Sequence, residues 1–239
     1  MATLDKQKLK NIVLKFPKRT STNLKDFIKN VKQETNNLKD EEKAYIVFYW
    51  ISQNIEYDVK GRNSGFSDTS PIGTFNNGKS VCSGYSRLFK CLATSIGLDV
   101  ICIDGYAKDI EYDIKEEISG TNHEWNIIKL DNVFYQIDST WGAGYVNKDI
   151  YSKELKEFYF CPEPIEFFPS HFPNESKWQL IYPTLSKEEF SKRVSFNFIF
   201  YQLLKTDYIY YAIKLKKRDK IRFYKKKKFT IFFIFKKRT

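Results

Sequence analysis

One apolar stripe at helical spacing constrains this chain more than any other feature. Its members fall at i, i+3, i+4, i+7, i+8 and i+11, a spacing that predicts a long helix buried along one side. They are Tyr85, Leu88, Phe89, Leu92, Ala93 and Ile96. Gly97 follows, at the position where a left-handed residue ends a helix. Counted back from there, Cys82 lies in the first turn of the helix or directly before it.

Strand-like segments follow this helix. Residues 98–106 read as one strand, and residues 123–130 and 133–138 read as two more. The dipeptide Asp131-Asn132 between the last two is typical of a tight turn. Helices followed by strands predict an α+β fold in which helices pack on one side of an antiparallel sheet.

Two further helices are predicted upstream, over residues 24–31 and residues 40–55. The second begins with Asp40 as N-cap and has acidic residues in its first turn. The remaining parts of this region read as loops or mixed structure because they are polar or rich in Gly and Pro. These parts are residues 58–80, residues 107–121 and residues 142–195.

The charge is concentrated at one end of the chain. The formal net charge is +11, but residues 196–239 carry +12 and residues 1–195 carry −1. We therefore expect a basic leader over residues 1–20, one domain over residues 21–195 and a basic aromatic tail from residue 196. Lys beside Phe and Tyr can contact an anionic membrane or a polyanion such as nucleic acid. The alternative for the tail is a poorly folded, low-complexity extension.

The number and spacing of the cysteines indicate the cellular setting of the chain. The four cysteines include no C-x-x-C pair, which argues against a structural zinc site; they are Cys82, Cys91, Cys102 and Cys161. A disulfide framework is not expected in a chain with 42% hydrophobic residues. Residues 1–10 lack the apolar segment of a secretory signal. We expect a reducing, cytoplasmic setting.

A Cys, a His and an Asp form the candidate chemistry. A thiol attacks as the thiolate, and the partial positive charge of a helix N-terminus favours that form at Cys82. If Leu130 pairs with Val133 across the turn, His123 and Asp138 become diagonal neighbours on one face of the hairpin. The pattern predicts Cys82 as nucleophile, His123 as base and Asp138 as the residue that orients His123.

Each of these residues also has a simpler interpretation. A lone Cys on a helix is most often a packing residue, and we assign Cys91, Cys102 and Cys161 to that role. The chain has only two histidines, so His171, which lies among prolines, is the competing base. Trp125 and Trp141 flank the proposed pair and read as core residues that can also exclude water.

Three motifs resemble the transglutaminase-like superfamily, in the order Cys, His, Asp. They are GKSVCSGY at residues 78–85, HEWN at residues 123–126 and YQIDSTWG at residues 135–142. The helix leading from Tyr49 to Asp58 fits the same core. Further segments resemble the kyphoscoliosis-peptidase branch of that superfamily. These are Pro164, His171-Phe172-Pro173, Trp178-Gln179-Leu180 and Glu189-Phe190.

The resemblance implies a papain-like fold and a thiolate–imidazolium pair that needs no cofactor or metal for its chemistry. The implied activity is cysteine-dependent acyl transfer or hydrolysis on protein or peptide amides through a thioester. The implied site residues are Cys82, His123 and Asp138. Because the superfamily also includes inactive members, the alternative is a catalytically silent scaffold that binds proteins in cytoskeletal or cell-division assemblies.

Overall fold

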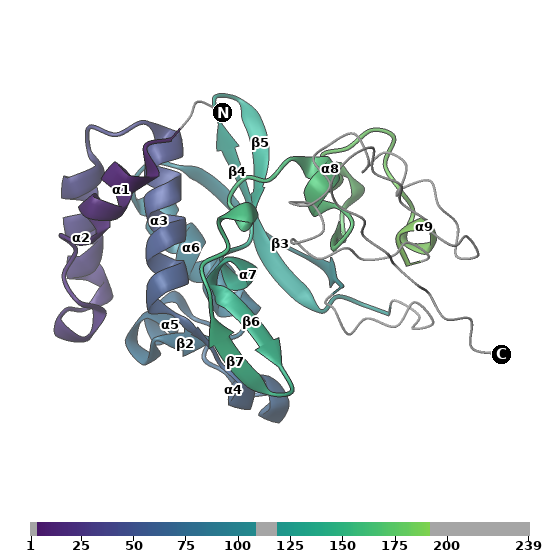
Figure 1. Ribbon diagram of the computed structural model, residues 1–239, viewed down its shortest axis with the longest axis horizontal. Helices are drawn as coiled ribbons and strands as arrows, with labels where there is room; N and C mark the ends of the chain where they lie inside the picture. Colours follow the sequence, from purple (N-terminus) through teal and green to yellow (C-terminus); the bar gives the residue numbers. More distant parts are fainter. Residues whose placement is uncertain (1–3, 109–118, 192–239) are drawn as a thin grey trace, which may run out of the picture.

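The computed structural model describes residues 4–108 and 119–191. At its centre lies a four-stranded antiparallel sheet with the strand order β5-β4-β3-β8. Helix α6 packs directly on β3 and β4, α3 packs on α6, and α1 packs on α3, which builds a helical layer beside the sheet (Figure 1). This is the α+β architecture predicted from the sequence.

The α-helices are α1 (Lys6–Val13), α2 (Leu24–Thr35), α3 (Asp40–Asn54), α4 (Val59–Ser64), α5 (Pro71–Asn77), α6 (Cys82–Ser95), α7 (Ser139–Ala143), α8 (Pro164–Phe167) and α9 (Lys187–Ser191). The strands are β1 (Glu56–Tyr57), β2 (Lys79–Ser80), β3 (Asp99–Ala107), β4 (His123–Leu130), β5 (Val133–Ile137), β6 (Gly144–Asn147), β7 (Ile150–Lys153) and β8 (His171–Pro173). Short 3₁₀ turns are η1 (Arg19–Ser21), η2 (Glu157–Tyr159) and η3 (Ser176–Gln179).

Helix α6 confirms the buried helix that the apolar stripe predicted. Every stripe residue is buried, and Gly97 adopts a left-handed φ of 91° just past the helix end. Cys82 is the first helical residue, as predicted. Burying a Leu or Phe side chain contributes about 2 kcal/mol, so this face anchors the position of Cys82 in the domain.

The hairpin has the predicted register. Asp131 and Asn132 both adopt positive φ, at 47° and 62°, and Leu130 pairs with Val133. The ladder ends at Ile137, one residue earlier than expected. The main-chain N–H of Asp138 donates to the carbonyl of Tyr159, and its side chain caps α7. Direct strand pairing beyond Ile137 was therefore wrong.

Alternation along β4 directs successive residues to opposite faces of the sheet. Asn126 donates to the carbonyl of Ser86 on α6, whereas the ring of Trp125 contacts Phe167 on α8, with centroids 6.2 Å apart. The helical layer therefore covers one face, and the chain from α8 onward contributes to the other.

The expectation that residues 1–20 form a basic leader outside the domain is wrong for residues 4–20, the part of this segment that the structure describes. Leu9 of α1 has 0% exposure. Glu157, on η2, accepts from Lys6 and Lys10 at 2.8 Å each and from the Tyr45 hydroxyl at 2.5 Å. Helix α1 is therefore part of the domain core, bound through contacts with residues distant in sequence.

The expected loop over residues 58–80 contains α4 and α5. Asp58 and Ser70 cap the two helices, accepting from the N–H of Gly61 and Gly73 at 3.0 Å each. Each helix ends at a glycine in the left-handed conformation. Asp40, expected as an N-cap, is instead the first residue of α3, and Lys39 is the cap.

Residues 142–191 hold only short elements, as their prolines predict. The predicted domain end at residue 195 and the basic tail over residues 196–239 lie outside the described residues. Within the described part, no helix is both long and apolar enough to cross a membrane.

Candidate active site

The segments before and after Cys82 in the sequence both fix its position. Before it, β2 pairs in parallel with β1, which sets Tyr57 opposite Ser80. After it, Gly84 lies against Ser80 and Thr74, and a Cβ at that position would lie 2.0 Å from the Ser80 hydroxyl. Gly84 is therefore required by internal packing against β2 and α5.

The thiol of Cys82 differs electrostatically from the others. Burial raises its pKa, but a hydrogen bond to His123, the charge of His123 and the main-chain N–H of Glu124 outweigh burial, so the pKa is lowered. In contrast, burial raises the pKa of the thiols of Cys91, Cys102 and Cys161. Within the chain, Cys82 is the thiol whose surroundings favour the thiolate.

His123 opens β4 and links Cys82 to Asp138. Its Nε2 donates to Oδ2 of Asp138 at 2.7 Å, which leaves Nδ1 as the nitrogen for Cys82. Burial lowers the pKa of His123, but the charge and hydrogen bond of Asp138, with a further contribution from Cys82, raise it to about 10. The predicted contact between His123 and Asp138 is confirmed, although Asp138 reaches it as a helix cap.

Asp138 is fully buried, and its carboxylate is saturated with donors. Oδ1 accepts from the main-chain N–H of Thr140 at 2.8 Å and of Trp141 at 3.0 Å. Burial raises its pKa, yet the charge and hydrogen bond of His123, followed by those of His171, hold the pKa well below the usual range. Asp138 is therefore a carboxylate fixed in one orientation.

His171 also reaches this carboxylate, which the sequence did not predict. It lies on β8, and its Nε2 donates to Oδ2 of Asp138 at 3.0 Å. Its side chain has 0% exposure and stacks on Phe167 with ring centroids 3.9 Å apart. Burial lowers the pKa of His171 to about 4 despite its bond to Asp138. His171, which the sequence offered as the alternative catalytic base, is thus a buried neutral imidazole on another side of Asp138.

Both flanking tryptophans lie against the imidazole of His123. The ring of Trp125 is 5.9 Å from it and nearly parallel, and the ring of Trp141 is 5.8 Å from it. Trp125 is almost completely buried and donates through Nε1 to Oε1 of Gln136 at 3.0 Å. Trp125 belongs to the hydrophobic core and Trp141 packs against it, so the expectation that both are core residues is confirmed.

His123, Asp138 and His171 offer three ligand atoms within 4.8 Å of one another. Imidazole nitrogen and carboxylate oxygen are ligands that zinc accepts. Here, however, both Nε2 atoms donate to the same Oδ2, so the three groups already satisfy one another. The arrangement fits a proton-sharing cluster better than an open metal site.

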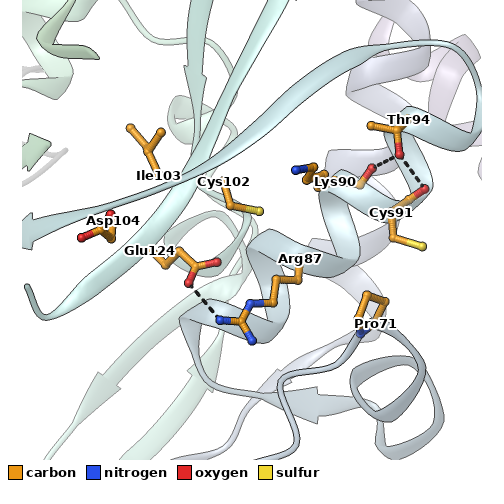
Figure 2. A pocket seen from close by; sticks show the side chains of 9 residues that line it. All are labelled: Pro71, Arg87, Lys90, Cys91, Thr94, Cys102, Ile103, Asp104 and Glu124. Carbon is orange, nitrogen blue, oxygen red and sulfur yellow. Dashed lines mark hydrogen bonds and ion pairs between the residues drawn. The ribbon is translucent and has the colours of Figure 1, made fainter. Parts of the chain in front are cut away.

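An open cavity of about 560 Å³ lies between α6 and β3 (Figure 2). Arg87 and Lys90 of α6 face Cys102 and Asp104 of β3 across it. Glu124, next to His123, joins this wall to α6 through Ser86 and through Nη2 of Arg87 at 3.6 Å. The cavity borders the site through Glu124, and its lining includes neither Cys82 nor His123.

Residues 26–139 match the transglutaminase-like superfamily. The chain is 30% identical to mouse kyphoscoliosis peptidase over 182 residues and 31% identical to the human protein over 183 residues. Each match covers 74% of this chain and 27% of the relative. The chain belongs to the transglutaminase-like superfamily. Within it, these relatives support the kyphoscoliosis-peptidase-like branch that the sequence predicted.

A more distant relative is cytokinesis protein 3 of Schizosaccharomyces pombe, 28% identical over 144 residues, with 59% of this chain and 16% of the relative covered. The chain thus spans about a quarter, or less, of the length of the curated relatives it matches.

Proposed function

We propose that this transglutaminase-like domain catalyses cysteine-dependent acyl transfer or hydrolysis on protein or peptide amides. The observation that carries the proposal is the hydrogen-bonded series Cys82, His123 and Asp138. One thiol has a lowered pKa, and the imidazole beside it has a raised one. Such a pair favours thiolate and imidazolium at neutral pH, the reactive state of a cysteine nucleophile.

In the first step, the Cys82 thiolate attacks the carbonyl carbon of the amide. The oxyanion would face the start of α6, where the main-chain N–H groups of Cys82 and Ser83 have no hydrogen-bond partner within residues 4–108 and 119–191. The C–N bond then breaks, and His123 gives its proton to the leaving amine. The product of this half-reaction is a thioester on Cys82.

In the second step, His123 takes a proton from water or from an incoming amine, which attacks the thioester carbonyl. The C–S bond then breaks, and the new acid or amide leaves. His123 keeps the proton that it took, so the thiolate–imidazolium pair is restored. Asp138 keeps the Nε2–H tautomer of His123 and stabilises its charged form throughout. Water gives hydrolysis and an amine gives cross-linking.

A blocked glutamine dipeptide with hydroxylamine as acceptor tests this proposal, with the covalent adduct read by mass spectrometry. We expect hydroxamate formation and a transient acyl adduct on Cys82, both lost in Cys82→Ala. The matched control is Cys102→Ala, which should retain both signals because that thiol has a raised pKa. An adduct on Cys102, or none on any cysteine with this donor and with an ester donor, would contradict the proposal.

The second candidate is a catalytically silent scaffold in cell-division or cytoskeletal assemblies. It is favoured by the likeness to a relative named cytokinesis protein 3. The two candidates differ at Cys82, since a scaffold should keep its binding partners after Cys82→Ala and show no acyl adduct in the unmodified chain. Under either candidate, the four free cysteines fit the reducing, intracellular setting that we propose.

A further inference from the structure

We propose that His171 is a positioning residue of the site, which fixes Asp138 through its Nε2–H beside the bond from His123. The inference rests on the proposed function and assigns a role to a residue that does not touch the reacting thiol. It is carried by the sharing of one oxygen. Oδ2 of Asp138 accepts from His123 at 2.7 Å and from His171 at 3.0 Å.

Hydrogen bonding and burial together assign the protonation of His171. An ionised carboxylate is only an acceptor, so His171 must carry its proton on Nε2. Its Nδ1 lies 2.8 Å from the hydroxyl of Ser170, whose single proton has two acceptors within reach, this Nδ1 and the carbonyl of Phe167 at 3.2 Å. Burial lowers the pKa of His171, so the ring is neutral near pH 7 and the Ser170 hydroxyl donates to Nδ1. His171 is therefore a neutral donor with both nitrogens engaged, and it adds no charge to the site.

The ring of His171 is also held rigidly. It stacks on Phe167 with an interplanar angle of 18°, meets the edge of Trp141 with centroids 4.6 Å apart, and lies on β8 opposite Ala107 of β3. Packing and strand pairing fix the Nε2–H direction before any substrate binds. A group locked in this way orients its partner more accurately than a mobile one.

The second donor changes what Asp138 can do. Burial alone favours the neutral carboxyl, and each donated hydrogen bond favours the anion. The donors to Oδ2 are His123, which must move a proton during the reaction, and His171, which need not. His171 thus keeps Oδ2 anionic and correctly oriented when His123 changes its charge or shifts toward the substrate.

The titratable groups around Asp138 come from several elements. They are Cys82 of α6, His123 of β4, His171 of β8, Tyr57 of β1 and Tyr159 of η2. Burial, followed by the charges of Cys82 and Asp138, raises the pKa of Tyr57 to about 12, and burial followed by Asp138 raises that of Tyr159. Both hydroxyls stay neutral near pH 7. A change in the acid side of the pH profile of Cys82 reactivity therefore reports on the thiol and the imidazoles.

The test compares His171→Gln with His171→Met in the full chain. The two replacements have similar length, but Gln places an N–H donor near the position of Nε2 and Met has none. The pH profile of Cys82 alkylation by iodoacetamide is the readout, and it requires no substrate. Thermal unfolding of both variants reports any shared loss of packing on Phe167.

We expect the acid limb of the profile to move to higher pH by about one unit in His171→Met, because a less well oriented Asp138 supports the His123 imidazolium less. At pH 6 this gives a roughly tenfold slower alkylation. The His171→Gln limb should remain within about 0.3 units of the original, while both variants lose similar thermal stability.

An acid limb that stays in place, or moves to lower pH, in His171→Met would overturn the inference, and so would equal shifts in Gln and Met. If His171→Met fails to fold, a shifted limb in His171→Gln overturns it as well. An ordinary thiol profile for Cys82 in the unmodified chain would instead refute the proposed function, so the two failures are distinguishable.

Discussion

The start of β4 and the three-residue strand β8 each bring one imidazole to the same carboxylate oxygen, yet one ring is charged near pH 7 and the other is neutral. His123 adjoins the Cys82 thiol and has a pKa raised to about 10, whereas His171 is enclosed by aromatic rings and has a pKa lowered to about 4. Both donate to Oδ2 of Asp138. Proximity to a carboxylate alone therefore does not decide the charge of a histidine. Both rings are buried against Asp138, but Cys82 further raises the pKa of His123, whereas the charge of His123 lowers the pKa of His171.

The largest effect should come from the carboxylate itself. Asp138→Asn removes the negative charge and puts an amide donor against Nε2–H groups, which forces the wrong tautomer on His123. We expect acyl-transfer rates to fall on the order of a thousandfold or more. The amide oxygen can still accept from Thr140 and Trp141, so thermal unfolding should stay cooperative.

His171→Ala is the comparison variant for that measurement. It removes one of the two imidazole donors and leaves the charge on Asp138, so its loss in rate should be far smaller. Equal losses for Asp138→Asn and His171→Ala would show that His171 has the role assigned to His123.

A matched substitution at each imidazole sharpens the contrast. His123→Gln should slow alkylation of Cys82 at pH 7 by at least about tenfold, because the thiolate loses its imidazolium and its pKa rises by one unit or more. The same change at position 171 should alter this rate by less than about threefold, since the donor to Asp138 is retained. The measurement is the second-order alkylation rate from peptide mass spectrometry.

A reversed order, with His171→Gln the slower of the two, would contradict the assignment of the two rings. The alkylation rate of Cys91 in each variant is the internal control, because its partly buried thiol should be unaffected by either change.

Stability against pH should show the smallest but most characteristic difference. The folded chain holds a proton on His123 up to a pKa of about 10, above the ordinary value of about 6.5, so this contribution is complete below pH 6.5 and is lost as pH rises through 10. His171 has a folded pKa of about 4, so its contribution is complete above pH 6.5 and is lost as pH falls through 4.

Thermal unfolding midpoints from pH 4 to pH 10 measure both contributions. We expect His171→Gln to weaken the decline on the acid side only, and His123→Gln to weaken the decline on the alkaline side only. Identical curves for the two variants would remove the basis for calling one ring charged and the other neutral.

Local signals in the sequence were sufficient for much of this site. The apolar stripe and Gly97 placed Cys82 at a helix start, and the turn at Asp131 and Asn132 fixed the register that brings His123 toward Asp138. These features depend on residues close together in the chain, where periodicity and turn chemistry apply directly. The structure confirms each of them.

The remainder depends on contacts between distant residues. Helix α1 belongs to the domain because Leu9 is buried and because Glu157, far along the chain, accepts from Lys6 and Lys10. His171 reaches Asp138 because β8 pairs with β3, and three residues are too few to show strand alternation. Its sequence signals were scarcity, since the chain has only two histidines, and its place in the segment His171-Phe172-Pro173 that carries the resemblance to the family branch.

The proposed function requires that Cys82 forms a thiolate–imidazolium pair with His123. The most direct test of this pair is competitive alkylation of the unmodified chain between pH 5 and pH 10, with the reaction at each cysteine quantified by mass spectrometry. Cys82 should titrate below the ordinary thiol value of about 8.5 and should react fastest near pH 7. Cys91 and Cys102 should titrate above that value because burial raises the pKa of each. If Cys82 reacts no faster than Cys91 or Cys102 at pH 7, the pair does not form, and the domain is not the thiol enzyme proposed here.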